Sequence, residues 1–91
     1  MTVRKIKGHE SAQVKVFEYE DGARTLMSYT TAVIRIDREG WMEISGLYSR
    51  TTIKHIGWFM REYGFTYQLA KQLYMDNKRF NIYTGEVEDR G

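Results

Sequence analysis

The chain has 91 residues, of which 42% are hydrophobic and 14% aromatic, and its net charge is +2. This length predicts one domain over residues 1–91, and the composition is too rich in apolar side chains for a disordered chain. The absence of cysteine excludes a disulfide framework and a thiolate metal site. The first residues, MTVRKIKGHESA, lack the apolar segment of a signal peptide, and no apolar run approaches the roughly 20 residues that cross a bilayer. We therefore expect a cytoplasmic protein that does not engage a membrane.

The charges are distributed unevenly along the chain. Residues 47–80 carry six cations and two acids, a net charge of +4, whereas the remainder carries eight cations and ten acids, a net charge of −2. A basic region of this kind either attracts phosphate groups or forms an ordinary solvated surface.

The first half of the chain has the pattern of β-strands. Residues 13–19, QVKVFEY, alternate with a period of two, which is typical of a strand whose Val14 and Val16 face inward. The Glu-Asp-Gly that follows (20–22) predicts a hairpin turn, because Asp-Gly tolerates the positive φ of a tight turn. The return strand is then ARTLMSY, residues 23–29.

Two further strands are predicted at 31–37 and 41–45, joined by a turn at 38–40. The side chains expected to face inward from these strands are Ala32, Ile34, Ile36, Met42 and Ile44. Those expected to face outward from the first of them are Thr31, Val33 and Arg35.

The period then changes to that of a helix. Apolar residues at helical spacing predict a stripe that faces the core, made of Ile53, Ile56, Phe59, Met60 and Tyr63. Gly64 is suited to ending this helix, and Thr66 is suited to capping a second one over 67–77, which Asn77 ends. The inner face of the second helix is expected to be Leu69, Ala70 and Leu73.

This order of elements predicts an α+β fold. An antiparallel meander of three to four strands precedes two helices that pack on one face of the sheet. Residues 79–85, RFNIYTG, form either a short final strand or a tail that packs on the sheet. Residues 1–11 lack a period, and we expect them and residues 86–91 to be flexible.

The stretch YSRTTIKHI (48–56) places hydroxyls and cations directly before the apolar stripe. Three residues suit the N-cap, where an oxygen accepts a hydrogen bond from a free backbone amide: Ser49, Thr51 and Thr52. Arg50 and Lys54 oppose the positive end of the helix dipole, which costs about 0.3–1 kcal/mol unless an anion binds there. The stretch is therefore either an anion site made by Arg50, Thr51 and Lys54 or an ordinary helix start with solvated cations.

Neither histidine predicts a metal or a catalytic centre. We expect His55, beside Ile56 at the edge of the stripe, to be structural, for example by donating to a backbone carbonyl; the alternative is a titrating or ligand-binding group. His9 lies in the segment expected to be flexible, so it supplies no second ligand. Ser49 and His55 carry no recognisable triad signature, and no Gly-rich phosphate loop is present. We therefore expect neither catalysis nor a cofactor.

Lys54, Trp58 and Arg61 share the outer face of the predicted helix. A tryptophan between two cations is typical of a cation–π cluster or of an anchor for a partner, and the alternative is burial of Trp58 against the second helix. The residues predicted to bind a partner or a phosphate are therefore Arg50, Thr51, Lys54, His55, Trp58 and Arg61.

A second apolar surface is predicted on the sheet. Four side chains share its outer face: Phe17, Tyr19, Val33 and Trp41. Either helices cover that face, or it is an exposed patch that marks a partner site.

The segments SYTTAV (28–33) and YSRTTIKHIGWF (48–59) resemble a family of small domains of unknown function encoded by bacteriophages and prophages. The family's pattern is Ser-Tyr-x-Thr-x-Val followed by Tyr-Ser-x-Thr-Thr-x-x-His-Ile-x-x-Phe. The matching residues are Ser28, Tyr29, Thr31, Val33, Tyr48, Ser49, Thr51, Thr52, His55, Ile56 and Phe59. The resemblance covers about residues 28–64, and Ile34 departs from the small residue of the pattern. It implies a bacterial host cytoplasm but no activity.

A small phage-type protein without a catalytic motif is expected to act by binding. We expect a non-enzymatic accessory protein that engages host or phage macromolecular machinery, such as an anti-CRISPR-like inhibitor of a host defence nuclease. The alternatives are a regulator that binds DNA or RNA through the helix start near residues 49–54, and a small homo-oligomeric structural protein such as a homodimer. A net charge of +2 is low for a strong nucleic-acid binder, which favours a protein partner, alone or within a protein–nucleic acid complex.

Overall fold

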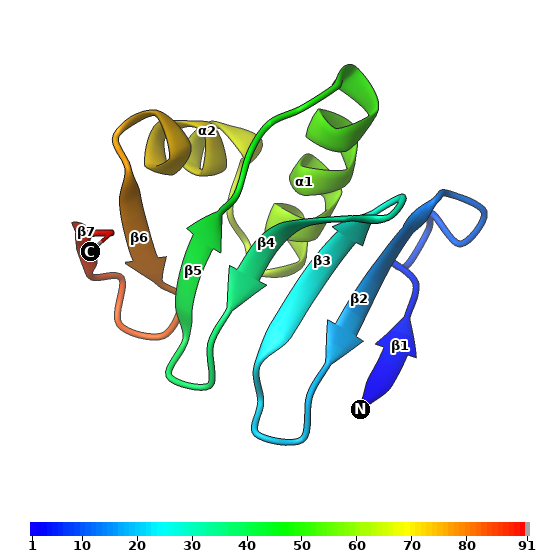
Figure 1. Ribbon diagram of the computed structural model, residues 1–91, viewed down its shortest axis with the longest axis horizontal. Coiled ribbons are helices and arrows are strands. Elements are labelled where there is room, and N and C mark those ends of the chain that lie inside the picture. The colour runs from blue at the N-terminus through cyan, green and yellow to red at the C-terminus, as the bar shows by residue number, and fades with distance from the viewer. Residues whose placement is uncertain (91) are drawn as a thin grey trace.

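The computed structural model describes residues 1–90 and shows a seven-stranded antiparallel sheet with two helices (Figure 1). The strands follow one another across the sheet in chain order. The elements are β1 (Thr2–Arg4), β2 (Val14–Glu18), β3 (Arg24–Ser28), β4 (Thr31–Ile36), β5 (Trp41–Ile44), α1 (Arg50–Glu62), α2 (Tyr67–Met75), β6 (Lys78–Asn81) and β7 (Val87–Asp89). The predicted α+β class and antiparallel meander are confirmed, whereas the sheet has seven strands rather than three to four.

The strands missing from the prediction lie toward the two ends of the chain. β1 falls within residues 1–11 and β7 within residues 86–91, the two segments expected to be flexible. Each has only three residues, which is too few for a period of two to be recognised in a sequence. They form the two edges of the sheet, a place where short strands are common. β6 occupies the start of segment 79–85, for which a final strand was one of the two predicted states.

The predicted hairpin turns are present, and local chemistry explains them. Gly22 and Gly40 have backbone φ angles of +93° and +96°, which residues other than glycine rarely adopt. Asp37 Oδ1 accepts hydrogen bonds from the backbone amides of Glu39 and Trp41, at 2.9 and 3.0 Å. Such aspartate-to-backbone bonds are a common way to fix a tight turn.

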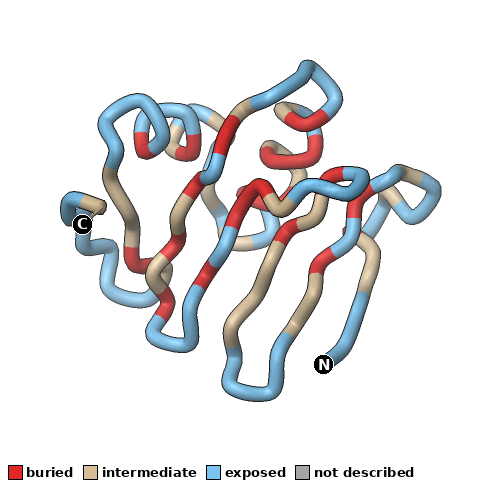
Figure 2. The backbone as a smooth tube through the Cα atoms, viewed as in Figure 1, coloured by how far each residue is buried: buried red, intermediate tan, exposed pale blue. Residues whose placement is uncertain are grey.

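Both helices pack on the same face of the sheet, as predicted (Figure 1). Alternate residues of the central strands face the helices and are buried, and Figure 2 shows these positions in red. The strands contribute Val14, Val16, Leu26, Ile34, Ile36, Met42 and Ile44, and the helices contribute Ile56, Phe59, Met60, Ala70 and Leu73. Removing this apolar surface from water is the main favourable term that holds the layers together.

The prediction that Val33 faces outward is wrong, because its side chain is completely buried. The pairing of β3 with β4 shifts between Leu26 and Met27, so that Leu26 pairs with Ile34 and Met27 with Ala32. Val33 is the extra residue of this β-bulge. A bulge interrupts the period of two, so alternation alone assigned Val33 to the wrong face.

The helix ends follow the predicted capping residues. Gly64 has a φ of +80°, and its amide donates to the carbonyl of Arg61 at 3.0 Å, as in a Schellman end of α1. Thr66 caps α2 by accepting a hydrogen bond from the amide of Leu69 at 3.4 Å. Asn77, with a φ of +54°, follows the last turn of α2 and redirects the chain into β6.

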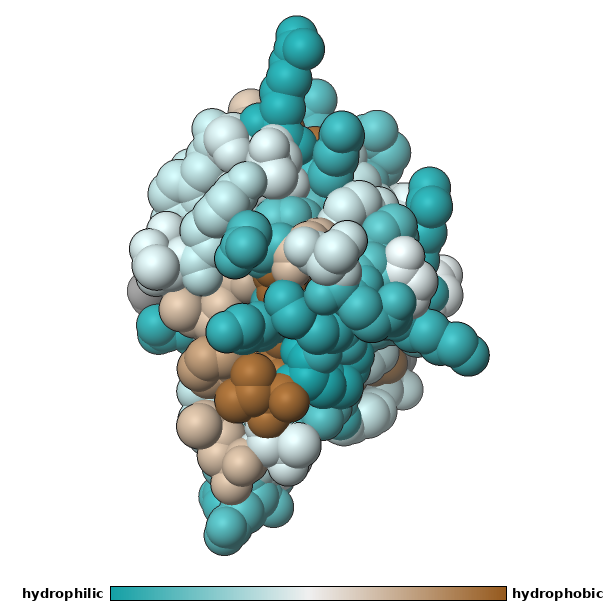
Figure 3. Space-filling view, turned by 90° about the vertical axis from the view of Figure 1, so that its right-hand side faces the viewer, coloured by the Kyte–Doolittle hydropathy of each residue, from teal (hydrophilic) through white to brown (hydrophobic). Residues whose placement is uncertain are grey.

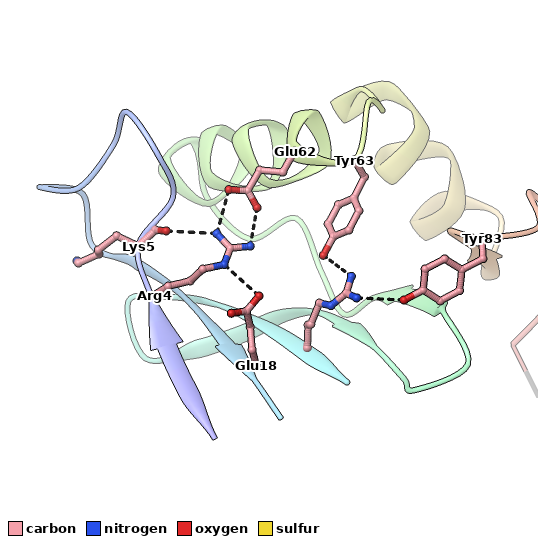
Figure 4. Close-up of polar contacts among 7 residues, drawn as sticks. Arg4, Lys5, Glu18, Glu62, Tyr63 and Tyr83 are labelled. Atoms are coloured by element: carbon pink, nitrogen blue, oxygen red, sulfur yellow. Dashed lines mark hydrogen bonds and ion pairs between the residues drawn. The ribbon is translucent and has the colours of Figure 1, made fainter. Parts of the chain in front are cut away.

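Arg4 ties β1 to α1 (Figure 4). Its guanidinium donates to both carboxylate oxygens of Glu62, at 2.8 and 3.0 Å, and to Glu18 of β2 at 3.1 Å. Ile6, which follows β1, is buried in the core. These contacts fix the N-terminal segment against both the sheet and the helix.

The outer face of the sheet lies opposite both helices and is open. Three of the four predicted residues lie on it: Phe17, Tyr19 and Trp41. The guanidinium of Arg79 lies 4.6 Å from the ring centroid of Trp41 and covers part of the indole.

Figure 3 shows the side of the molecule at the β1 edge, where an apolar patch adjoins a largely hydrophilic surface. The exposed apolar residues of that edge are Met1 and Val3.

Candidate functional site

α1 begins after Ser49, one of the predicted capping residues. The backbone of Ser49 is extended (φ −125°, ψ 169°), and its Oγ accepts a hydrogen bond from the amide of Thr52 at 3.2 Å. The first turn contains no acidic residue, and Arg50 and Lys54 are exposed. Within residues 1–90, neither cation forms an ion pair. The helix start therefore presents free positive charge together with the positive end of the helix dipole.

Behind this helix start, polar side chains form a network between β3 and α1. Ser28 Oγ lies 2.7 Å from Nδ1 of His55 and 3.2 Å from Oγ1 of Thr52. Ser49 Oγ donates to the same Thr52 oxygen at 3.2 Å. Ser28, Thr52 and His55 are at most 5% exposed, so each depends on these partners. The network fixes the end of β3 against the first turn of α1.

Nδ1 of His55 pairs with the Ser28 hydroxyl, a different partner from the backbone carbonyl considered from the sequence. Burial lowers the pKa of His55 below its ordinary value of 6.5, and the nearby His9 lowers it further. The surroundings of His55 therefore favour the neutral ring.

We expect the free energy of unfolding to fall as the pH drops from 7.5 to 5.5. In the unfolded chain His55 takes up a proton near its ordinary pKa. In the folded protein its pKa is lower, so the proton binds only at a lower pH, and protonation therefore favours the unfolded chain. Urea denaturation at the two pH values measures the effect. His55→Gln is the comparison, because glutamine does not titrate; an equal decrease in that variant would assign the pH dependence to other groups.

Two exposed tyrosines adjoin the network, and both have an unusual backbone. Tyr29, next to Ser28 in the β3–β4 turn, has a φ of +56°, and Tyr48, next to Ser49, has a φ of +37°. Large side chains rarely adopt a positive φ, and such a residue costs on the order of 1–3 kcal/mol. The two tyrosines are 57% and 65% exposed. The fold thus holds two large aromatic side chains at the surface in strained conformations.

These tyrosines and the start of α1 form one surface. Two hydrogen bonds, one between Ser28 and Thr52 and one between Ser49 and Thr52, join the residues that adjoin the two tyrosines. We call it the tyrosine surface, and its residues are Tyr29, Tyr48, Arg50, Thr51 and Lys54, all exposed.

Gly46 determines where the ring of Tyr48 lies. Gly46 is buried, and a Cβ atom at this position would lie 2.6 Å from Cζ of Tyr48. The ring therefore lies directly over Gly46, and any side chain at position 46 would displace it.

Trp58 is half-buried, and a residue from the N-terminal segment covers one face of its indole. The imidazole of His9 stacks on it, with ring centroids 3.6 Å apart and planes 8° from parallel. Lys54 and Arg61, on either side of Trp58 along α1, are exposed. On the predicted outer face of α1, the two cations are therefore exposed to solvent, whereas the tryptophan is partly covered.

Arg61 lies near the opposite end of α1 from Arg50, about 16 Å away along the helix axis at 1.5 Å per residue. A pocket of about 250 Å³ lies beside it, lined by Lys7, His9, Trp58, Arg61 and Glu62. The predicted site residues thus separate into two groups with His55 buried between them: Arg50, Thr51 and Lys54 at the helix start, and Trp58 and Arg61 at the pocket.

The contact between Ser28 and His55 provides only part of a catalytic arrangement. Ser28 is 2% exposed, so its hydroxyl is closed to a substrate. In the part of the chain that the structure describes, no carboxylate is hydrogen-bonded to His55.

Among residues 1–90, no group of three or more His, Cys, Asp or Glu side chains is placed to hold a metal ion. No helix in that range is long and apolar enough to cross a membrane.

Sequence reasoning does not single out Tyr29, Tyr48 or His9 as site residues. The two tyrosines each stand beside a serine, in Ser28-Tyr29 and in Tyr48-Ser49, and both pairs belong to the segments on which the predicted resemblance rests. This repeated pairing was the available signal. His9 had no such signal, because its stacking on Trp58 joins residues far apart in the sequence.

The protein is a small α+β domain whose antiparallel sheet carries two helices on one face, with a candidate binding surface where the longer helix begins. The chain belongs to a family of unknown function, DUF8033, whose model matches residues 1–81. The match includes the N-terminal hairpin and both helices, and so exceeds the 28–64 range of the predicted resemblance. No match was found among curated proteins or among solved structures.

Proposed function

We propose that the protein is a non-enzymatic binding protein that engages a macromolecular partner through the tyrosine surface. The strained backbone at Tyr29 and Tyr48 carries this proposal. The other non-glycine residue with a positive φ in residues 1–90 is Asn77, and asparagine tolerates this conformation at a helix end. Glycine or asparagine at positions 29 and 48 would cost less, so a role for the tyrosine side chains explains their presence.

Exposed tyrosines next to cations suit partner recognition. Tyrosine gives a large, rigid contact area and a hydroxyl at its tip, and tyrosine and arginine are enriched in binding hot spots. Arg50 and Lys54, which are unpaired within residues 1–90, add attraction for an acidic or phosphate-bearing partner.

The proposal extends to a biological setting. The likeness of residues 28–33 and 48–59 to phage and prophage domains supports an accessory protein that acts in a bacterial host cytoplasm on host or phage machinery. An anti-CRISPR-like inhibitor of a host defence nuclease fits this setting, because occupying a surface of the nuclease requires no catalytic group.

Two other functions have specific support. The free cations Arg50 and Lys54 at the start of α1 favour a regulator that binds DNA or RNA directly. The edge of β1, with Met1 and Val3 exposed beside it, favours a small homo-oligomeric protein, since a free edge strand can pair with another copy.

Site-specific photocrosslinking tests the proposal without knowledge of the partner. Replacing Tyr29 or Tyr48 by p-benzoylphenylalanine should give a discrete crosslinked product in a bacterial lysate, because both side chains face the partner. The same group at Met75 of α2, which is 67% exposed, is the matched control and should not give that product. Identical products from all three positions, or none from positions 29 and 48, would contradict the proposal.

A further inference from the structure

Four aromatic rings form a continuous row along one flank of α1. The ring centroid of Tyr29 lies 5.9 Å from that of His55, and His55 lies 5.3 Å from Trp58. Trp58 in turn lies 3.6 Å from His9 and nearly parallel to it. His55 is buried, whereas Tyr29 is exposed and Trp58 and His9 are partly exposed. The row therefore runs from the tyrosine surface to the pocket beside His9.

Three cations flank this row. Lys54 and Arg61 lie about one turn before and after Trp58 on α1, and Lys7 lines the pocket with His9. All three are exposed, and within the described residues none of them forms an ion pair. Aromatic rings and free positive charges therefore lie side by side along the flank.

Two carboxylates lie beside this flank, and one of them is paired with a cation. Glu62 also lines the pocket, but both of its oxygens accept hydrogen bonds from Arg4. Glu10, in the same segment as His9, accepts a hydrogen bond from the amide of Gly8 at 2.6 Å. Arg4 compensates the charge of Glu62, whereas Glu10 keeps its negative charge because a neutral amide donor does not cancel it. The flank therefore retains three free cations against one free acid.

Several other acids lie far from this flank. Four of them are in the β2–β3 and β4–β5 turns, at the opposite end of the sheet from the start of α1 (Figure 1): Glu20, Asp21, Asp37 and Glu39. Charges separated by more than about 8–10 Å are largely screened at physiological salt. The low net charge of the chain therefore does not describe the flank of α1, which is locally basic.

We propose that this flank binds a single-stranded nucleic acid, with bases stacked on Tyr29 and on the His9–Trp58 pair and phosphates held by Lys7, Lys54 and Arg61. Each nucleotide brings one π face and one phosphate, so a row of rings flanked by cations matches its repeating chemistry. Unpaired bases are required, because the rings stack on base faces that a duplex hides. This inference rests on the proposed function and names the class of partner; the flank shares Tyr29 and Lys54 with the tyrosine surface and extends it along α1.

Fluorescence anisotropy with labelled octathymidylate tests the inference. Binding should weaken with salt, with a slope of roughly two in log affinity against log salt for three phosphate contacts. The double substitution Lys54→Gln and Arg61→Gln should weaken binding by about tenfold and reduce the slope. Tyr29→Ala should weaken it by roughly tenfold with the slope unchanged, because it removes stacking but no charge.

Two controls make the result specific. Lys71→Gln removes an exposed cation from α2 and should leave the affinity within about twofold of wild type. A duplex of the same length should bind more weakly than the single strand. Circular dichroism of each variant verifies that the fold is retained.

Several results would overturn the inference. They are no binding at 50 mM salt, equal weakening by Lys71→Gln, and duplex binding as strong as that of the single strand. The proposed function would survive any of these if positions 29 and 48 crosslink a protein but Met75 does not. Failure of both experiments would remove the tyrosine surface as a binding site.

Discussion

Replacing His55 by alanine should lower the free energy of unfolding by about 2–4 kcal/mol. The imidazole is 2% exposed and fills the space between the sheet and α1, so truncation leaves a cavity. It also removes the partner of Ser28 Oγ at 2.7 Å. The cost of an unfilled cavity and the cost of a weakened buried hydrogen-bond network therefore add. Chemical denaturation of the wild type and the variant measures the difference.

Lys54→Ala is the matched control, because Lys54 precedes His55 on the same helix and is exposed. It should change the stability by less than about 0.5 kcal/mol. A loss below about 1 kcal/mol for His55→Ala would mean that the network between β3 and α1 does not hold the two elements together.

Replacing Tyr48 by glycine should weaken partner binding by about tenfold or more while leaving the domain as stable as the wild type, or more stable by up to about 2 kcal/mol. Glycine relieves the strain at a φ of +37°, which offsets the roughly 0.5–1 kcal/mol that its greater freedom costs. Binding falls because the exposed ring is lost. Urea denaturation measures the stability, and the crosslinking yield from p-benzoylphenylalanine at position 29 measures the binding.

Tyr83→Gly is the control for exposure, because Tyr83 is 64% exposed but does not have a positive φ. It should lower the stability, since no strain is relieved and a hydrogen bond from Arg24 at 3.0 Å is lost. Gly46→Ala tests the position of the ring independently, because the new methyl group displaces Tyr48. A destabilised Tyr48→Gly with unchanged binding would show that the tyrosine serves the fold and not a partner.

The sequence predicted those features that depend on near neighbours. Asp-Gly and Glu-Gly at the turns, alternation in β2 and β5, and capping by Thr66 and Gly64 all act over a few residues, and all are present in the structure. The number of strands could not be predicted in this way, because β1 and β7 have three residues each and are defined by pairing with their neighbours.

The candidate site was predictable only in part, for a related reason. Arg50, Thr51 and Lys54 were identified because a helix start has a local signature. The strain at Tyr29 and Tyr48 was not, since a positive φ at a tyrosine contradicts local preference and is imposed by the surrounding fold. The stacking of His9 on Trp58 also joins distant segments, so no periodic pattern contains it.

Backbone amide chemical shifts during a titration with octathymidylate show whether the flank of α1 binds a single strand. They locate the binding surface residue by residue without altering the protein. The largest changes should fall on Tyr29, Thr51, Lys54 and the indole of Trp58, which belong to the tyrosine surface and the aromatic row. If the largest changes fall instead on Phe17, on its pairing partner Thr25 and on Trp41 of the open sheet face, the binding surface lies on the opposite side of the sheet and the flank of α1 is not the binding site.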